Sequence, residues 1–228
     1  MMKKIIKFIL RINVRTIYFN FKYFPLKQAI KFPVLLSRKV KLFRTLGTVE
    51  IKSEHIQTAM IKIGFGEVAI FDKKYSRSIW NVQGKVIFNG SAQIGHGSKI
   101  AVGENGILEF GENFQVSAES SIVAFHNVKF GNDCLLSWDV LIMDTDFHYI
   151  TNSDNEIINS PKPIVIGNKV WIGCRSLVLK GSVIPDNCVI GANSIVNQTK
   201  PNQTKPNSLW VGNPAKEIKQ NINWTDNI

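Results

Sequence analysis

A six-residue repeat runs through the C-terminal part of this chain. In rows of six, residues 166–201 read IGNKVW, IGCRSL, VLKGSV, IPDNCV, IGANSI and VNQTKP. The first position of each row is a branched aliphatic residue: Ile166, Ile172, Val178, Ile184, Ile190 and Val196. A period of six matches neither the 3.6 residues of an α-helix nor the simple alternation of a long strand.

The other restricted positions suit a short strand followed by a tight corner. Glycine recurs at the second position (Gly167, Gly173, Gly191), and a small residue or valine stands at the fifth (Val170, Ser176, Ser182, Cys188, Ser194). The aliphatic residue would point inward, the glycine would permit the bend, and the small residue would fit where neighbouring walls converge. Three units close a coil of about eighteen residues, and stacked coils repeat at about 4.8 Å. We therefore expect a mainly β protein, a parallel β-helix shaped as a triangular prism.

The repeat also fixes the expected domain organisation. The same phase continues upstream at Phe130, Leu136 and Ile142; a second set offset by two contains Phe110, Val116, Ile122 and Val128; and Phe88, Ile94 and Ile100 continue the spacing less regularly. This spacing predicts a prism over residues 60–200, with a protruding loop at 143–163. A basic, aromatic extension or cap would occupy residues 1–59, and a tail with a short helix at KEIKQNI would occupy 201–228.

Positive charge is concentrated at the N-terminus. The net charge is +11 with 28 basic and 17 acidic residues, and residues 1–44 hold twelve Lys or Arg and no Asp or Glu, which leaves 16 basic residues against 17 acidic ones elsewhere. Positive charge among Phe, Tyr and Ile suits an anionic membrane surface, a polyanionic glycan or nucleic acid. A solvated basic face on an end cap explains it equally well, so these alternatives stay open.

The opening residues resemble a signal peptide but lack its pattern. Lys7, Arg11 and Arg15 interrupt the apolar run, and no small-residue cleavage site follows. No stretch reaches the roughly 18–20 uncharged apolar residues that span a bilayer. The three cysteines lack CxxC spacing, which favours a reducing cytosol over a disulfide scaffold. We expect a retained N-terminus and a cytoplasmic protein, with peripheral contact at the inner face of the membrane as an alternative.

Three stretches of this chain resemble the hexapeptide-repeat acyltransferases, especially the galactoside, maltose and antibiotic acetyltransferases and their relatives in capsule and surface-polysaccharide clusters. The matching stretches are VWIGCRSLVLKGSVIPDNCVIGANSIV at 170–196, a histidine-bearing loop that precedes Trp171, and VGNPAKEIK at 211–219. The resemblance covers the chain from about residue 88 to its end. It implies a left-handed coil, against the usual right-handed crossover rule, and a homotrimer with active sites between adjacent prisms.

The resemblance gives the loop histidine, His148, the catalytic role. Acyl transfer from a thioester to a hydroxyl needs a base, donors for the developing oxyanion and an acid, and one imidazole can serve as both base and acid. The loop leaves a rigid wall, so it can project toward a neighbouring subunit. Asp146, or less favourably Asp144, would fix the imidazole tautomer or contact sugar hydroxyls. Solvated loop side chains are the alternative for all three residues, and for the other candidates near the acceptor: His126, Tyr149, Asn152 and Asn155.

For the donor, the resemblance places the pantetheine arm of acetyl-CoA along a groove between walls. The matching positions are Ser137, Cys174 and Ala192, where small side chains also suit corner packing. Cys174 departs from the Ser or Gly common in the family, which leaves donor specificity open. Trp171 would border the same cleft or pack at the prism edge. The tail lysines Lys216 and Lys219 match basic residues near the CoA phosphates, with exposed charges as the alternative.

Rival functions on the same scaffold fit this sequence less well. A zinc enzyme of the gamma carbonic anhydrase type needs a close histidine pair, and the four histidines, at positions 55, 96, 126 and 148, include no such pair. A structural or ice-binding prism would show a regular Thr or charge ladder and no long polar loop. We therefore expect an acetyl-CoA-dependent O-acetyltransferase without a metal, acting on a sugar hydroxyl in capsule, lipopolysaccharide or other surface-glycan synthesis. Its acceptor would be free, nucleotide-linked or lipid-linked, and not nucleic acid. N-acetylation of an amino sugar and a non-enzymatic prism remain the alternatives.

Overall fold

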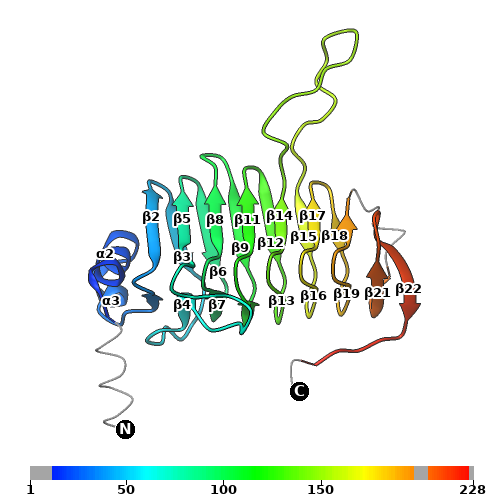
Figure 1. Ribbon diagram of the computed structural model, residues 1–228. Helices are drawn as coiled ribbons and strands as arrows, with labels where there is room; N and C mark the ends of the chain where they lie inside the picture. Colours follow the sequence, from blue (N-terminus) through cyan, green and yellow to red (C-terminus); the bar gives the residue numbers. More distant parts are fainter. Residues whose placement is uncertain (1–11, 198–204, 226–228) are drawn as a thin grey trace.

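A computed structural model describes residues 12–197 and 205–225 of the chain (Figure 1). The described part is a column of stacked coils with helices at one end and a projecting loop on one side. The predicted end of the prism near residue 200 and the first basic residues, Lys3 to Arg11, lie outside the described residues. No helix in the described ranges is long and apolar enough to cross a membrane.

Three parallel sheets form the walls of the prism, and we name them A, B and C. Sheet A contains β1 (Val34–Leu36), β4 (Ile61–Phe65), β7 (Ala92–Gly95), β10 (Phe114–Val116), β13 (Leu135–Leu136), β16 (Trp171–Ile172), β19 (Val189–Ile190), β21 (Ser208–Val211) and the antiparallel β22 (Lys216–Gln220). Sheet B contains β2 (Val40–Thr45), β5 (Ser78–Val82), β8 (Lys99–Val102), β11 (Ser121–Ala124), β14 (Leu141–Met143), β17 (Leu177–Leu179) and β20 (Ile195–Val196). Sheet C contains β3 (Thr48–Ile51), β6 (Lys85–Phe88), β9 (Ile107–Phe110), β12 (Asn127–Phe130), β15 (Ile164–Ile166) and β18 (Val183–Ile184).

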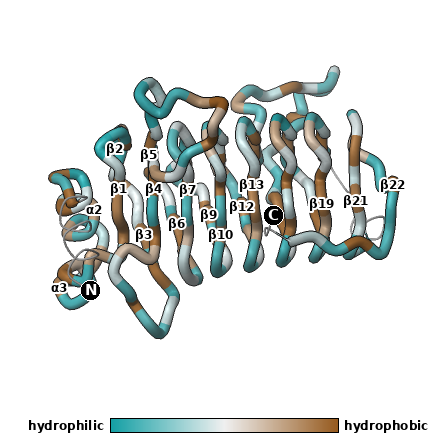
Figure 2. Tube along the Cα trace, turned by 60° about the horizontal axis from the view of Figure 1, so that its bottom comes forward, coloured by the Kyte–Doolittle hydropathy of each residue, from teal (hydrophilic) through white to brown (hydrophobic). Residues whose placement is uncertain are grey.

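The chain passes from A to B to C in each coil, so the three sheets meet at three long edges, A/B, B/C and C/A. Three in-register parallel sheets, arranged as in a left-handed β-helix, confirm the predicted fold class. The first-position residues of the repeat are buried, as expected, and hydrophobic segments recur along the strands of successive coils (Figure 2).

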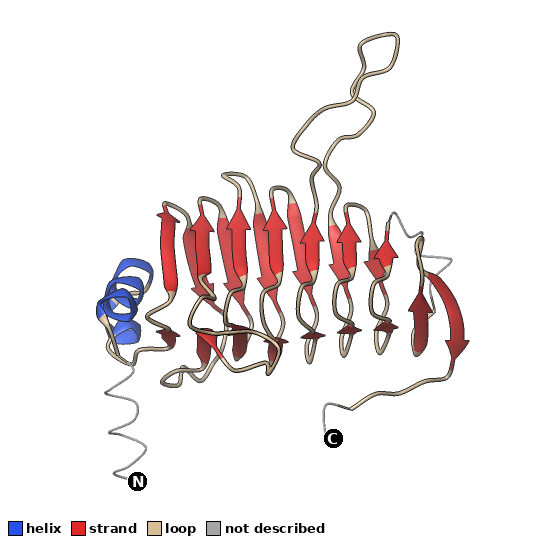
Figure 3. Cartoon of the chain, viewed as in Figure 1, coloured by secondary structure: helices blue, strands red, loops and turns tan. Residues whose placement is uncertain are grey.

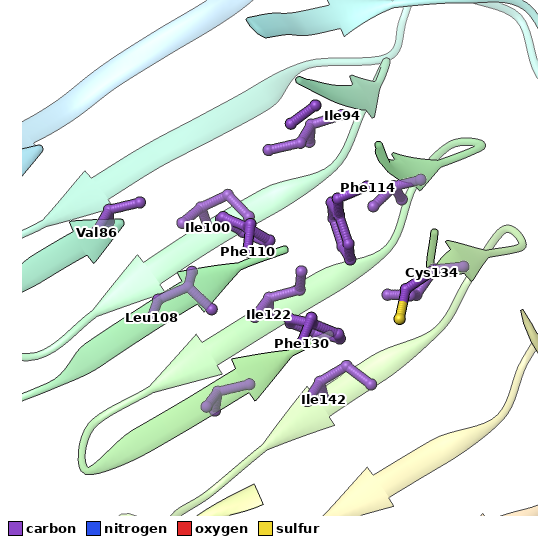
Figure 4. Packing of buried hydrophobic residues seen from close by; sticks show 14 of the residues in the cluster. Val86, Ile94, Ile100, Leu108, Phe110, Phe114, Ile122, Phe130, Cys134 and Ile142 are labelled. Carbon is purple, nitrogen blue, oxygen red and sulfur yellow. The ribbon is translucent and has the colours of Figure 1, made fainter. Parts of the chain in front are cut away.

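Stacked aromatic rings fill part of the prism interior (Figure 4). The rings of Phe88 and Phe110 lie 5.0 Å apart, those of Phe110 and Phe130 lie 5.7 Å apart, and Phe114 tilts against the last two. Phe88, Phe110 and Phe130 occupy equivalent positions in β6, β9 and β12 of sheet C, so parallel stacking brings identical side chains into one ladder.

The corners differ from the sequence prediction, which assigned the bend to the second-position glycines. The residue with positive φ is instead at the fourth position of the repeat: Lys169 (53°), Arg175 (58°), Gly181 (77°), Asn187 (54°) and Asn193 (57°). Asn and Asp adopt this left-handed conformation more readily than most residues, and they also provide it at other corners.

The second-position glycines are required by the close approach of the next coil. A Cβ on Gly173 would lie 2.6 Å from the backbone nitrogen of Ala192, and a Cβ on Gly167 would lie 2.8 Å from the backbone carbon of Pro185. Neither glycine has a positive φ. The prediction that glycine permits the bend was therefore wrong, because the tight packing is between coils and not within the corner.

Coil length varies along the column, which explains the offset between the two upstream sets of aliphatic residues. Gln93 pairs with Gln115, and Gln115 pairs with Leu135, so each of these earlier coils is longer than three units of the repeat. The coil that begins at Leu135 and ends at its partner Trp171 is longer still, because it contains the protruding loop. Trp171 pairs with Val189, which follows it by three units. A fixed period of six therefore holds between β15–β17 and β18–β20 and ends again at β21, where Leu209 follows its partner Val189 by more than three units.

The prism begins earlier than the predicted boundary at residue 60. Strands β1, β2 and β3 pair with β4, β5 and β6, so residues from Val34 onward form the first coil. The sequence concealed this coil because the stretch from Val34 to its partner Ile61 is much longer than three units, and no six-residue spacing survives. The part of the predicted extension that lies outside the prism is therefore shorter, and it contains α2 (Val14–Tyr23) and α3 (Leu26–Ala29).

Helix α2 covers the open end of the prism. The buried side chain of Asn20 donates to the carbonyl oxygen of Val34 (2.7 Å) and accepts from its backbone nitrogen (3.2 Å). Thr16 makes the same pair of contacts with Leu36, through its hydroxyl, at 3.2 and 3.0 Å. These two side chains satisfy edge groups of β1 that would otherwise be buried without partners.

The C-terminal tail differs from the predicted short helix. Residues 216–220 form strand β22, which pairs antiparallel with β21 and covers the last edge of sheet A (Figure 3). Lys and Glu favoured a helix by intrinsic propensity, but pairing with the exposed edge of β21 satisfies backbone groups that a helix would leave open. The helices of the described chain, α2 and α3, both lie at the opposite end.

Candidate active site

The protruding loop leaves the prism at the B/C edge, between Met143 at the end of β14 and Ile164 at the start of β15. It extends far from the column (Figure 1). A short antiparallel contact between Thr151 and Ile157 closes its outer part. The loop therefore has a base beside the prism and a tip that extends away from it.

His148 lies on the rising part of this loop with its side chain exposed. Its carbonyl oxygen accepts a hydrogen bond from Nδ2 of Asn159 at 2.8 Å. Among the described residues, the imidazole itself has no hydrogen-bond partner. The chain thus fixes the backbone of His148 and leaves both ring nitrogens open to another molecule.

A polar network fixes the base of the loop. The amide of Asn159 donates to Asp146 Oδ2 (2.9 Å) and to the carbonyl of His148, and its oxygen accepts from the backbone nitrogen of Ile150 (2.6 Å). The ammonium of Lys180 donates to the same Asp146 oxygen and to the carbonyl of Asn159. The side chain of Asn159 therefore connects the descending half of the loop to the rising half on either side of His148.

Asp146 serves this network instead of contacting the imidazole. The hydrogen bond from Lys180 lowers the pKa of Asp146, burial opposes this shift, and Asn159 adds to it. Lys180 is buried, whereas the side chain of Asp146 is 41% exposed, so water screens part of the attraction between the two charges. The predicted contact between Asp146 and the His148 ring is absent from the described chain.

Asp144 also has a structural partner. Its buried carboxylate accepts hydrogen bonds from the backbone nitrogens of Phe125 and His126, both at 2.8 Å. The carboxylate thereby holds the preceding turn at the B/C edge, where the ring centroids of Phe147 and Phe125 lie 4.9 Å apart. A carboxylate that accepts from two backbone amides inside the protein is not available to a sugar, whereas His126 is exposed beside it.

The loop also carries exposed apolar side chains, of which the sequence analysis named only Tyr149. Phe147, Tyr149, Ile150 and Ile158 are 56%, 69%, 57% and 61% exposed. Asn152, a predicted acceptor contact, instead organises the tip by accepting from the backbone of Asp154 and Glu156. Asn155 lies at the tip with a φ of 62°. Apolar groups on an arm that leaves its own prism are typical of a contact with another chain.

The predicted donor residues gather on a different edge of the prism. Ser137, Cys174 and Ala192 lie at the A/B edge in three successive coils, shortly after β13, β16 and β19. Asn193 donates its backbone N–H to the carbonyl of Cys174 at 2.9 Å, so the later two coils are in direct contact. Ser137 and Cys174 are half-buried and Ala192 is exposed. These small side chains leave room for another molecule close to the backbone of this edge. That room fits the predicted path of the pantetheine arm of acetyl-CoA.

Two predicted neighbours lie beside this edge. Trp171 is 37% exposed on the outer face of sheet A, and its indole N–H donates to Ser137 Oγ at 3.1 Å. Val211 occupies the same position in β21 as Gly191 does one coil earlier, directly after β19. Lys216 pairs with Val211, so this lysine lies at the C-terminal end of the A/B edge. Lys219 pairs with Leu209 further along β22, and both lysines are exposed.

The chain does not bring the two halves of the predicted site together. His148 belongs to the B/C edge and the small residues to the A/B edge, with the whole of sheet B between them. A small cavity of about 210 Å³ lies at the loop base, lined by Asp146, Ile158, Asn159, Lys162, Leu179, Lys180 and Asn197. This cavity therefore borders the loop base and contains none of the predicted donor residues.

Asn159 and Lys180 are site residues that sequence reasoning missed. Met143 pairs with Leu179, so Lys180 lies directly beside the start of the loop although it is distant from Asp144 in the sequence. The available signal in the sequence was the charge of Lys180 inside the repeat, in the coil that follows the one with the loop. Among the described residues, no group of three His, Cys, Asp or Glu side chains could hold a metal ion.

Comparison with known proteins points to one family. The family model described as "Bacterial transferase hexapeptide (six repeats)" matches residues 163–198. A putative lipopolysaccharide biosynthesis O-acetyl transferase, WbbJ of Escherichia coli K12, is 30% identical over 148 residues, which are 60% of this chain and 72% of WbbJ.

Two further curated relatives are similar over shorter parts. The galactoside O-acetyltransferase of Escherichia coli K12 is 33% identical over 50% of this chain and 54% of its own length. The polysialic acid O-acetyltransferase of Escherichia coli O1:K1 / APEC is 34% identical over 56% of this chain and 38% of its own length. The chain thus spans most of WbbJ but only about half or less of these two relatives.

Proposed function

Since this chain belongs to the hexapeptide-repeat acetyltransferase family, we propose that it transfers an acetyl group from acetyl-CoA to a hydroxyl of a sugar. The curated relatives named above are O-acetyltransferases, and two of them carry galactoside or polysialic acid in their names. Lipopolysaccharide synthesis in the name of the first supports a surface glycan as the acceptor. The observation that carries the assignment is the exposed imidazole of His148 on a loop that is rigidly held at its base.

His148 is the base and then the acid in the proposed reaction. A ring nitrogen accepts the proton of the sugar hydroxyl while the hydroxyl oxygen forms a bond to the thioester carbonyl carbon. Backbone N–H groups stabilise the resulting oxyanion. The carbon–sulfur bond then breaks, the imidazolium gives its proton to the departing thiolate, and the products are the acetylated sugar and CoA. No covalent acyl-enzyme forms.

The donor would bind along the A/B edge. Cys174 and Ala192 provide a wall with short side chains, and Gly173 lies so close to the next coil that even a Cβ would meet its backbone at 2.6 Å. Trp171 would border the cleft at Ser137. Lys216 is exposed where the edge ends and Lys219 is exposed further along β22, and both would attract the CoA phosphates.

We further propose a homotrimer with its active sites between adjacent prisms. The position of His148 and the A/B edge on opposite sides of sheet B supports a site shared with a second molecule, and the exposed apolar side chains of the loop suit an interface. Closed cyclic symmetry lets each loop reach the A/B edge of one neighbour, so that every copy both gives and receives a catalytic arm.

The test is CoA release and product mass across free, nucleotide-linked and lipid-linked sugars. His148→Ala should lower the rate by about 10² to 10⁴ on the sugar that reacts best, with unchanged circular dichroism and thermal midpoint. His55→Ala is the matched control, because His55 is also exposed but lies between β3 and β4 at the C/A edge, away from both halves of the proposed site. Near-full activity of a folded His148→Ala protein would refute the role of His148.

A further inference from the structure

Helix α2 packs one face against the prism and exposes an apolar stripe on the opposite face. Thr16, Phe19, Asn20 and Tyr23 face the prism, where Phe19 and Tyr23 pack with Trp80. On the opposite side, Val14, Ile17, Tyr18 and Phe21 form a stripe at helical spacing that is 80%, 45%, 46% and 47% exposed. A helix that only closed the prism would carry polar residues on this outer side.

The same end surface extends onto α3 and is strongly basic. Leu26 and Ile30 are 67% and 59% exposed. Four exposed cations lie among these apolar residues: Arg15, Lys22, Lys27 and Lys31. The sequence from Ile12 to Val49 contains no Asp or Glu, so nothing acidic in this segment neutralises them. Figure 2 shows hydrophobic and hydrophilic residues alternating around this end.

We propose that this cap surface, made of the six exposed apolar residues and four cations named above, docks onto an anionic lipid bilayer. Apolar side chains would enter the headgroup region while the cations remain at the level of lipid phosphates. The proposal goes beyond the acetyl transfer proposed above and does not depend on the catalytic role of His148.

The combination of residues distinguishes a bilayer from other occupants. A polyanionic glycan or nucleic acid could stack on Tyr18 and Phe21 and pair with the cations, but it would leave the exposed aliphatic side chains Val14, Ile17, Leu26 and Ile30 in water. A second copy of the chain would place two basic, acid-free surfaces against each other, which like-charge repulsion disfavours. A lipid surface satisfies the apolar stripe and the cations together.

The position of the cap surface suits docking. Helices α2 and α3 lie across one end of the column, whereas the protruding loop and the three edges lie along its sides (Figure 1). Contact through this end would leave the loop and the A/B edge open to substrates. In the trimer proposed above, three parallel prisms would present three caps at the same end, which would strengthen attachment by multivalency.

The full chain is tested by co-sedimentation with vesicles of phosphatidylcholine alone or mixed with phosphatidylglycerol. We expect binding to the anionic vesicles that is at least tenfold stronger than to neutral ones and that weakens in high salt. The apolar variant Ile17→Ser/Phe21→Ser and the charge variant Lys27→Gln/Lys31→Gln should each weaken anionic binding by about tenfold or more. Ile107→Ser/Val165→Ser is the matched control, because these residues are also exposed but lie on β9 and β15 of sheet C, away from α2 and α3.

Several outcomes would overturn the proposal. Absence of wild-type binding to anionic vesicles would do so, as would an equal loss in the control variant. If only the charge variant lost binding, the surface would be a polyanion site. If the apolar variant changed the oligomer size in solution, the stripe would be an interface between copies. Thermal midpoints and activity on a free sugar confirm that each variant folds, so failure of the docking proposal is distinguishable from failure of the proposed reaction.

Discussion

At the scale of single residues, Asn159 connects the protruding loop around the proposed base. Its amide contacts Asp146, His148 and Ile150, and the backbone of Asn159 itself accepts from Lys180. The contacts reach only the backbone of His148, so Asn159 is a positioning residue in the proposed reaction. Catalytic geometry tolerates little displacement, since a shift of about 1 Å can cost about 10²-fold in rate.

Asn159→Ala should therefore lower kcat by about 10- to 100-fold, because His148 loses its fixed position. The KM for acetyl-CoA should stay the same, because the donor edge is elsewhere on the prism. Lys180→Met should give a similar change, and the double variant should be no worse than the more affected single one, because both act through Asp146 and the loop base. Steady-state kinetics with the donor varied measures both constants. Additive effects, or an equal rise in the donor KM, would contradict the positioning role.

The burial of His96 should make the stability of the fold depend on pH. It is buried at the A/B edge and neither ring nitrogen has a hydrogen-bond partner within the described chain. Burial lowers the pKa of His96, the charge of Glu119 opposes this shift, Lys73 adds to it, and Glu67 opposes it. The folded state therefore favours the neutral ring, whereas the unfolded chain takes up a proton below about pH 6.5.

The free energy of unfolding should consequently fall as the pH drops from about 7 to about 5. Glu119 has its own lowered pKa: burial would raise it, but hydrogen bonds from Lys99 and Ser76 outweigh burial, so its contribution is lost only at more acidic pH. His96→Leu should show a smaller loss over the same pH range in urea titrations. An equal loss in both proteins would exclude His96 as the cause.

At the scale of elements, α2 closes the prism with side chains that act like a neighbouring strand. Asn20 supplies one donor and one acceptor to Val34, as a paired backbone would. The helix also places Phe19 on Trp80, with ring centroids 5.1 Å apart. An end cap of this kind is needed because a parallel β-helix has open sheet edges at both ends.

Asn20→Ala should reduce the free energy of unfolding by about 2 to 4 kcal/mol, because both backbone groups of Val34 lose their partners in a buried place. Urea denaturation measures the change. Lys22→Ala on the exposed side of the same helix is the control and should change stability by less than about 0.5 kcal/mol. Equal losses of stability in the two variants would show that the hydrogen bonds of Asn20 to Val34 do not account for the effect.

At the scale of the whole molecule, the proposed active site combines two edges from different copies. A chain with His148→Ala keeps its donor edge, and a chain with Ala192→Trp keeps its histidine. Each alone should be inactive as a trimer. Isolated mixed trimers should recover about a third of wild-type activity, because each contains one interface of three with both intact parts, and the unfractionated population assembled from equal amounts should recover about a quarter.

This complementation is measured by CoA release after co-expression and purification with two different tags. No recovery in isolated mixed trimers would show that the site does not form between copies. Recovery well above a third would also contradict the proposal, because each mixed trimer has one intact interface of three. Size measurement in solution confirms the number of chains.

The sequence by itself determined the fold class and the inward-facing residues. Each six-residue unit repeats the same local requirement, so Ile166, Ile172 and Ile190 could be placed in the core without knowing their neighbours. It also indicated the loop, because 142–167 is the stretch where those requirements stop. The catalytic role of His148 and the donor contacts of Ser137, Cys174 and Ala192 stay predictions that rest on family resemblance and on position.

Only the tertiary structure decided which residues meet between coils. Lys180 reaches Asp146 because β14 and β17 are adjacent, and the loop that separates them in sequence carries no sign of this contact. The start of the prism at Val34 and the strand at 216–220 were settled in the same way, by pairing with neighbouring strands. The physical reason is that the six-residue repeat depends only on residues that are near each other in the sequence. Strand register, the covering of sheet edges and side-chain partners depend instead on the length and stacking of whole coils.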